Sequence, residues 1–402
     1  MFLSSLFKKP EQEISVLFDI SSRSVGGALL KLSRHEKPKI LYTARLPILF
    51  RRTPDPRELV TSTIAALTKV VEAIDTEGIA HLTFTEFKDH KVKEIFLVFS
   101  SPWYISQTKI ARLEKEKPFV FTESMLKGML AHEKTAYEKA ADIAPEKAGK
   151  NAINLLEQKV IQIRLNGYET AKPFGQSSRS AEVNIFSSFI DSLLLDRVKD
   201  VALHSFHPQR LEIHSFPGVA FSVLRDIFPG QNDFLIVDVG GEATEISLVK
   251  NGGLLETFSF PMGHNHALRK ISGVLDVSHE IALSSLSLFL EGKTFVKTSG
   301  KIEGVVKDTQ KEWNILFQSA LGNLGEQTAI PSSAFVIAER PFSNFFKDAM
   351  KTEKTDEKNF DEKNVTQIEP GLLALHYERN GIGEGDLFLS LEAIFLNKVF
   401  SK

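Results

Sequence analysis

The feature that most constrains the fold is a three-strand pattern that occurs twice in the chain. The first copy runs from Val16 to Leu32 (VLFDISSRSVGGALLKL) and continues through KILYTARLP, whereas the second copy begins at Phe234 with FLIVDVGGEATEISLV. In each copy an apolar strand ends at an aspartate, a short turn of small residues follows, and two more strands come after it. Because the order is the same in both places, the sequence predicts two related halves.

The turn of the second copy has the composition of a phosphate-binding turn. Asp238 ends the apolar strand, and Gly240 and Gly241 follow it. Glycine lets the backbone approach a ligand closely, and backbone N–H groups in such a turn can bind phosphate. A neighbouring carboxylate can hold magnesium through water molecules. Asp19 is the equivalent residue of the first copy, so we expect a nucleotide-binding origin for both turns.

Composition excludes several classes of protein. The net charge of −2 gives no basic surface, so nucleic acid is not an expected partner. The chain has no cysteine, which excludes disulfides and thiolate metal sites and is compatible with a reducing cytoplasm. No apolar run reaches the roughly 20 residues that a transmembrane helix needs. With 402 residues, the chain is long enough for two or more domains.

The pattern of expected elements changes along the chain, and these changes give the domain boundaries. A helix beginning near Thr122 and a hairpin at Asn166-Gly167 interrupt the first half and indicate an inserted module. The chain returns to a strand at Ala181. The predicted boundaries are 1–103 and 179–215 for the two parts of the first lobe, 104–178 for the insert, and 216–402 for the second lobe, with a helical subdomain at about 263–330 and a final helix at 387–400.

Taken together, these motifs resemble the actin-like superfamily of nucleotide-binding proteins. Five residues stand at the positions of that superfamily's second phosphate motif: Asp238, Gly240, Gly241, Thr244 and Glu245. Asp19 and Ser22 stand in the first phosphate motif, SFPGVAFSVL resembles the first connecting motif, and MGHNHAL resembles the segment that opens the helical part of the second lobe. The resemblance implies an α/β, actin-like (ribonuclease H-like) duplicated two-lobe fold with a small α+β insert in the first lobe.

The insert distinguishes branches within this superfamily. Its helix, the segment VIQIRLNGYETAKPFG and the strand after it are similar to the inserted subdomain of the FtsA family of bacterial cell-division proteins. The PilM family of type IV pilus assembly proteins has a related insert and is the close alternative. The resemblance therefore implies a scaffold that links a filament or a membrane-bound assembly in cell division. Pilus assembly and an active ATPase or kinase of the same superfamily are the alternatives.

The resemblance also implies a cofactor, ATP with magnesium, and assigns residues to it. Asp19 and Asp238 are the expected magnesium ligands, and no catalytic residue is identified. The residues expected to contact the nucleotide are Asp19, Ser21, Ser22, Arg23, Asp238, Gly240, Gly241, Thr244, Gly263 and Glu280.

Several positions depart from the superfamily pattern. Ser21 replaces a glycine of the first turn, and Leu283 replaces a lysine that contacts the nucleoside. The segment Glu339-Arg340-Pro341 replaces a glycine pair that lies over the adenine. We therefore expect weak ATP binding and negligible turnover.

The expected partners are proteins of a division or pilus assembly, and self-association is a further expectation. The apolar segment Leu387–Phe400 predicts either a helix packed in the core or a helix that contacts the membrane. The charge run Lys351–Asn364 predicts a solvated loop. The expected location is the cytoplasm. Peripheral attachment at the inner face of the cell membrane is a further expectation.

Overall fold

The computed structural model describes residues 11–48, 53, 55–82, 91–143, 153–293, 296–325, 329–351, 364–380 and 385–401. The chain forms two compact units, and each is built from separate stretches of sequence. Unit 1 comprises Met1–Phe99, Arg197–Leu224 and Ile368–Lys402. Unit 2 comprises Ser100–Asp196 and Arg225–Gln367.

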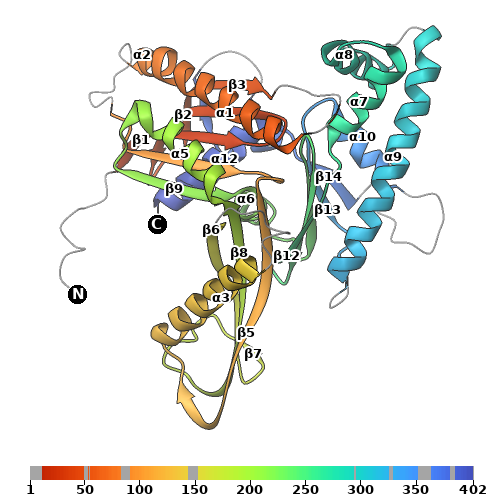
Figure 1. The fold of residues 1–402 in the computed structure, drawn as a ribbon. Helices are drawn as coiled ribbons and strands as arrows, with labels where there is room; N and C mark the ends of the chain where they lie inside the picture. Colours follow the sequence, from red (N-terminus) through yellow and green to blue (C-terminus); the bar gives the residue numbers. More distant parts are fainter. Residues whose placement is uncertain are drawn as a thin grey trace. The chain divides into compact units, whose positions relative to one another are not determined.

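Unit 1 contains a six-stranded sheet (Figure 1). Its strand order is β15-β3-β2-β1-β4-β9, with the first copy of the repeated pattern, β1 to β3, on one side of β4. β1 pairs antiparallel with β2 and parallel with β4. It is buried along nearly its whole length, as its apolar run predicts. The strands are β1 (Gln12–Ile20), β2 (Ser24–Ser33), β3 (Lys39–Pro47), β4 (Glu94–Phe99), β9 (Arg210–Ser215) and β15 (Glu378–Arg379).

Helices cover this sheet. α1 packs on β2 and β3, and α12 packs on β2 and β1. A side chain at Gly27 would meet Val70 of α1, whereas one at the adjacent Gly26 would point to the other face, toward the Arg45 side chain. Neighbouring residues of a strand point to opposite faces of the sheet. α1 covers the face of Gly27, and α12 covers the opposite face. The helices are α1 (Pro56–Ala73), η1 (Ile74–Gly78), α2 (Ile79–Leu82), α5 (Ser192–Phe206), α6 (Phe216–Ile227), α11 (Pro370–Leu373) and α12 (Leu387–Ser401).

The C-terminal helix α12 is part of the core of unit 1. Phe388, Leu389, Leu391 and Leu396 are each at most 1% exposed. Phe388 also contacts the Phe216 ring, with 5.6 Å between the ring centres. Most apolar residues of this helix are buried in unit 1, whereas Leu387, Ile394 and Val399 are part-exposed. The structure therefore supports the core alternative for Leu387–Phe400.

Unit 2 repeats the arrangement of unit 1 in a five-stranded sheet. The strand order β12-β11-β10-β13-β14 and the pairing directions match those of β3-β2-β1-β4-β9. This match confirms the predicted duplication. The strands are β10 (Phe234–Val239), β11 (Thr244–Lys250), β12 (Gly253–Phe260), β13 (Ala334–Ile337) and β14 (Val365–Gln367), and the helices are α7 (His264–Leu275), α8 (His279–Leu290), α9 (Val296–Gly325) and α10 (Phe342–Ala349).

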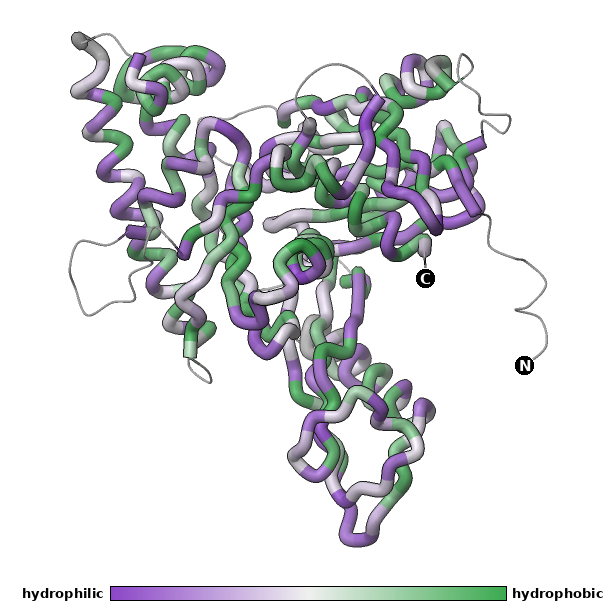
Figure 2. Tube along the Cα trace, turned by 180° about the vertical axis from the view of Figure 1, so that it is seen from behind, coloured by the Kyte–Doolittle hydropathy of each residue, from purple (hydrophilic) through white to green (hydrophobic). Residues whose placement is uncertain are grey.

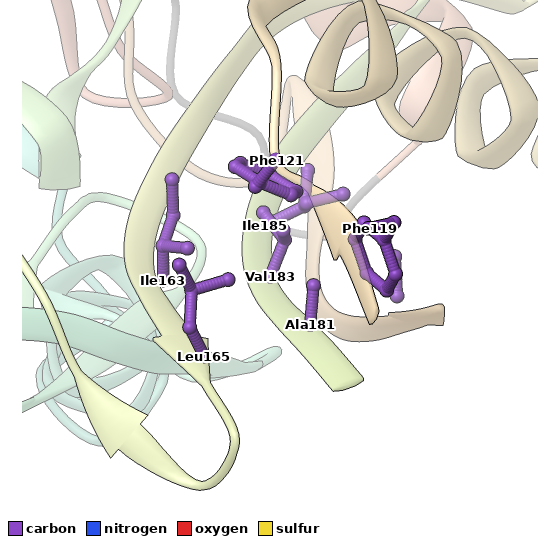
Figure 3. Close-up of a cluster of buried hydrophobic side chains, with 8 residues drawn as sticks. Phe119, Phe121, Ile163, Leu165, Ala181, Val183 and Ile185 are labelled. Carbon is purple, nitrogen blue, oxygen red and sulfur yellow. The ribbon is translucent and has the colours of Figure 1, made fainter. Parts of the chain in front are cut away.

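The strands between Tyr104 and Asp191 form a separate sheet with the order β5-β8-β6-β7. One helix, α3 (Glu123–Ile143), packs on it, and Figure 3 shows the core that these elements share. Phe119, Phe121, Ile163 and Val183 belong to this core, with Met125 and Met129 of α3 packed against it. The strands are β5 (Tyr104–Val120), β6 (Ile153–Leu165), β7 (Tyr168–Glu169) and β8 (Ser177–Asp191).

The compact units divide the chain differently from the boundaries expected from the sequence. The expected insert, 104–178, was assigned to the first lobe, but its strands belong to unit 2 together with β8. β5, β6 and β8 each contact β12, so the two sheets of unit 2 pack together. The predicted loop at Lys351–Asn364 falls on residues 352–363, which lie outside the described residues.

Candidate functional site

The first turn, Ser21–Arg23, places Asp19 among positive charges. Asp19 is fully buried near the end of β1. Its Oδ2 accepts a hydrogen bond from a terminal nitrogen of Arg45 at 2.8 Å, and a terminal nitrogen of Arg23 lies 3.6 Å from the same oxygen. The guanidinium of Arg23 stacks on Phe388, with its central carbon 3.3 Å from the ring centre. The structure thus pairs Asp19, an expected magnesium ligand, with two arginines.

The strand register explains how Arg45 reaches Asp19. Asp19 of β1 stands opposite Gly26 of β2, and Gly26 stands opposite Arg45 of β3. A side chain on Gly26 would overlap the guanidinium group of Arg45. The absence of a Cβ at Gly26 therefore leaves the space through which Arg45 crosses one strand to the carboxylate.

Two further acidic residues lie near Asp19 and its two arginines. Asp386 precedes α12, and Glu392 lies on it. Arg45 donates hydrogen bonds to Asp386 from Nε and from a terminal nitrogen, the latter at 3.0 Å. Burial acts to raise the pKa of Asp386, but the Arg45 charge and hydrogen bond lower it below its usual value. Glu392 is 0% exposed, and neither of its oxygens has a hydrogen-bond partner among the described residues. Burial and the Asp19 charge raise the pKa of Glu392 well above its usual value.

The backbone of the first turn is satisfied by Ser21. Its hydroxyl accepts hydrogen bonds from the N–H groups of Arg23 and Ser24, each at 3.3 Å, and donates to the Ser24 carbonyl at 2.9 Å. The Ser21 N–H also donates to that carbonyl, at 3.2 Å. Ser22 is 1% exposed. The serine that replaces a glycine here thus supplies an acceptor for the N–H groups that would otherwise face a phosphate.

The second turn, Gly240–Ala243, is closed by the start of α7. The N–H of His264 donates to the Gly240 carbonyl at 3.1 Å, and the N–H of Asn265 donates to the Gly241 carbonyl at 3.0 Å. N–H groups in the first turn of a helix have no partner within the helix and often bind anions. Here the two N–H groups at the start of α7 are used to hold the helix against the turn.

Glu242 adds an ion pair to the second turn. Arg269 of α7 donates two parallel hydrogen bonds to its carboxylate, at 2.9 and 2.7 Å, and the Asn265 side chain donates a third at 2.8 Å. Burial opposes ionisation, but the bonds from Arg269 and Asn265 lower the pKa of Glu242 below its usual value. The charge of Glu242 is therefore neutralised within unit 2.

Gly263 permits the close contact between α7 and the second turn. A Cβ there would overlap the carbonyl oxygens of Gly240 and Gly241, which cannot rotate away. We expect Gly263→Ala to destabilise unit 2 by about 2–3 kcal/mol, measured by urea denaturation. Gly273→Ala in the same helix is the matched control, because nothing lies within 4 Å of its Cβ position. The control should be neutral or stabilising by up to about 1 kcal/mol, and equal losses would contradict the described contact.

Thr244 and Glu245, the next positions of the expected phosphate motif, also have partners within unit 2. The Thr244 hydroxyl donates to the Met262 carbonyl at 2.7 Å and accepts from the Trp313 indole at 3.0 Å. Tyr104 of β5 donates to Glu245, so this side chain connects the insert sheet with β11. Burial, together with the nearby Asp238 charge, raises the pKa of Glu245 to about 8.

The raised pKa of Glu245 gives a prediction about pH. The folded protein holds a proton that the unfolded chain releases near its ordinary pKa of 4.5, so stability falls as pH rises from about 4.5 to about 8. Glu245→Gln should therefore match the parent at pH 4 and exceed its unfolding free energy by a few kcal/mol above pH 8. Thermal unfolding across this range measures the difference. If the difference in unfolding free energy between Glu245→Gln and the parent does not change with pH, the pKa of Glu245 is not raised in the folded protein.

The remaining expected contacts do not add a ligand-binding group. Glu280 is exposed at the start of α8 and accepts a hydrogen bond from Ser278 at 2.7 Å. Leu283 is half-buried on the same helix. Glu339, Arg340 and Pro341 lead into α10, and the Glu339 carbonyl accepts from the Phe342 N–H at 2.8 Å. Neither Leu283 nor Pro341 can donate a hydrogen bond from its side chain to a nucleoside.

Magnesium-bound ATP does not fit the residues as the structure arranges them. Asp19 already has two positive neighbours, which would repel a divalent cation. In the first turn the N–H groups of Arg23 and Ser24 bond to Ser21, and in the second turn the Gly240 N–H bonds to the Ala243 carbonyl. Among the residues that the structure describes, no group of three or more Asp, Glu or His side chains is placed to hold a metal ion. We therefore derive no reaction step through ATP or magnesium.

Among the helices that the structure describes, none is by itself long and apolar enough to cross a bilayer. α7 and α8 meet the length and composition criteria only when taken as a pair, and the two are bent by 101°.

Comparisons with known proteins identify the fold. No family model and no curated protein sequence matches the chain. The solved PilM–PilN type IV pilus biogenesis complex matches with a TM-score of 0.62 and 13% identity over 98% of this chain and 100% of that one. The ethanolamine utilization protein EutJ from Carboxydothermus hydrogenoformans gives a TM-score of 0.43, with 11% identity over 96% of this chain and 89% of that one. An actin-like ATPase-fold protein from Bacteroides thetaiotaomicron gives 0.43, with 7% identity over 96% of each chain. With the duplicated sheets described above, the chain has a mixed α/β actin-like ATPase fold.

Proposed function

We propose that this chain is a non-hydrolysing scaffold in an assembly that resembles the type IV pilus machinery. It works by binding protein partners. The observation that carries the proposal is the likeness to the PilM–PilN complex structure, which extends over 98% of this chain and 100% of that chain. It favours the pilus alternative over the cell-division interpretation. A location at the inner face of the cell membrane follows from such a role and is part of the proposal.

The geometry of the two turns supports a scaffold rather than an enzyme. In unit 1, Arg45 and Arg23 neutralise Asp19, and in unit 2, Arg269 neutralises Glu242. Each ion pair stabilises its turn without a ligand. An ATPase or kinase would need these groups to exchange internal partners for a nucleotide in every cycle. A protein that only holds others in place has no such requirement.

The proposal can be tested by in-cell cross-linking of the tagged full chain, followed by mass spectrometry of the linked peptides. We expect links to proteins of a pilus assembly, and each identified partner should then bind the purified chain without nucleotide. Links to division-filament proteins would instead support the cell-division alternative. No links beyond those of an unrelated cytoplasmic bait would contradict a scaffold, and steady phosphate release by the purified chain would favour the enzyme alternative.

A further inference from the structure

The sheet of β5, β8, β6 and β7 has one end that lies far from β12. At the other end, Tyr104 and Ser106 of β5 bond to β11 and β12. Glu114 stands ten residues beyond Tyr104 on an unbroken ladder with β8, which places it about 34 Å further along the sheet. Residues 114–120 and 164–180 meet at this far end, and we call them the insert tip. Figure 2 shows hydrophilic and hydrophobic stretches together there.

Three apolar side chains are exposed in the insert tip. Val120 is 51% exposed, Tyr168 is 80% exposed and Phe174 is 46% exposed. The Phe174 ring is held in place, because it stacks on the buried Phe121 ring with 6.1 Å between the ring centres. Exposed apolar side chains that gather at one end of a module indicate a surface that contacts another molecule.

These side chains do not share one face of the sheet. Val120 lies between the core residues Phe119 and Phe121, so it points to the face opposite the core. Tyr168 stands opposite Leu165, which faces the core, so Tyr168 lies on the core face. A rigid partner that docks on one face would leave the other face uncovered. A lipid layer is fluid and can surround an end that is apolar on both faces.

The insert tip also carries an excess of basic residues. Its net charge is +2, whereas the net charge of the whole chain is −2. None of its basic side chains has an ion-pair partner among the described residues. Lysine and arginine attract anionic lipid headgroups, and exposed aromatic side chains insert at the level of the headgroups. The basic residues are Lys115, Lys117, Arg164, Lys172 and Arg179, and the acidic residues are Glu114, Glu116 and Glu169.

We propose that the insert tip contacts the surface of a membrane that contains anionic lipids. The inference rests on the proposed location at the cell membrane, and it names the part of the chain that reaches the lipid. Lipid is the occupant because apolar side chains on both faces and unpaired basic side chains lie at the same end. The contact is weak for one chain and gains strength where an assembly holds several copies at one membrane.

Sedimentation of the purified full chain with lipid vesicles tests the proposal. We expect binding to vesicles that contain about 30% phosphatidylglycerol, and at least about fivefold weaker binding to vesicles of phosphatidylcholine alone. No pilus protein takes part, so a negative result would overturn the lipid contact and leave the binding of protein partners to its own test. Equal binding to the two kinds of vesicle would contradict the role of the basic residues.

Charge reversal shows whether the insert tip is the part that binds. Lys172→Glu combined with Arg179→Glu should weaken binding to the phosphatidylglycerol vesicles at least about tenfold. The matched control is Lys301→Glu combined with Lys311→Glu, which changes the net charge equally at exposed positions of α9. Equal losses in the two double variants would show general charge attraction and would overturn the proposal.

A second pair of variants tests the aromatic contact. Tyr168→Ser should weaken binding to the same vesicles severalfold while the far-ultraviolet circular dichroism stays unchanged. Leu375→Ser is the matched control, because the Leu375 side chain is 75% exposed but lies in unit 1. Binding that is insensitive to Tyr168→Ser, or reduced equally by Leu375→Ser, would contradict insertion of the tip into the lipid surface.

Discussion

Replacing Arg45 with methionine is expected to destabilise unit 1 by about 3–5 kcal/mol near neutral pH. Arg45 bonds to both Asp19 and Asp386, and its side chain is only 19% exposed. Methionine keeps most of the side-chain volume but leaves the buried Asp19 and the half-buried Asp386 with Arg23 as the nearby cation that remains. The loss should be smaller at pH 4.5, because protonation then removes part of the uncompensated negative charge.

Urea denaturation of the full chain at both pH values measures this effect. Arg112→Met is the matched control, because Arg112 makes one ion pair, with Glu182 at 3.0 Å, and is 62% exposed. An exposed pair of this kind contributes about 0–1 kcal/mol. Similar losses for the two variants would show that Arg45 is not part of a buried network and would remove the main argument against a cation at Asp19.

Replacing Glu392 with glutamine is expected to have a large effect of the opposite sign. Glu392 is fully buried on α12, and burial raises the pKa of its carboxyl well above the usual 4.5. The folded protein therefore keeps a proton that the unfolded chain releases, and stability falls as pH rises above about 4.5. Glu392→Gln cannot ionise, so its advantage over the parent should be near zero at pH 4 and should grow with pH.

The measurement is the unfolding free energy of both proteins from pH 4 to pH 9. At the upper end we expect a gain of at least about 1–3 kcal/mol, the cost of a buried polar group without a partner. Glu392→Met should give a similar pH profile, since it also removes the titrating group. If both variants are less stable than the parent at every pH, Glu392 has a stabilising partner and the described environment of α12 is incorrect.

The duplicated architecture was readable from the sequence because it depends on local patterns. The apolar runs that end at Asp19 and Asp238 became central strands of two sheets with the same order. The start of α1 also depends on local sequence, because Asp55 accepts from the Arg57 N–H at 2.8 Å and Pro56 is the first residue of the helix. The final helix was also readable, since a helix that is apolar nearly all round packs into a core more often than it lies on a membrane.

The strand β5 was not predicted, because its sequence does not look like a strand. The stretch KIARLEKEKP is rich in charge, but Ala111 and Phe119 face the core while residues 114–117 are exposed. The hydrogen bonds that define β5 come from β8, about 70 residues further along the chain. A strand held by distant pairing and exposed on one face leaves little trace in the local sequence.

The internal partners of the two turns could not be predicted for the same reason. Arg45 and Asp386 are separated by most of the chain, and only the folded sheet and α12 bring them to Asp19. One sequence signal did exist. Gly26, in the strand next to Asp19, indicates space for a neighbouring side chain, although it does not name Arg45. The resemblance to phosphate motifs drew attention to these two turns but not to the residues that bond to them.

The central claim is that both turns are closed by the chain's own residues, and calorimetric titration with magnesium and ATP tests it most directly. The full chain, Asp238→Ala and Arg45→Met would be titrated under the same conditions, and phosphate release would be followed in parallel. We predict no saturable heat up to about 1 mM ATP, which limits any binding to weaker than about −4 kcal/mol, and no phosphate release. Micromolar binding that Asp238→Ala abolishes, together with steady phosphate release, would contradict the account.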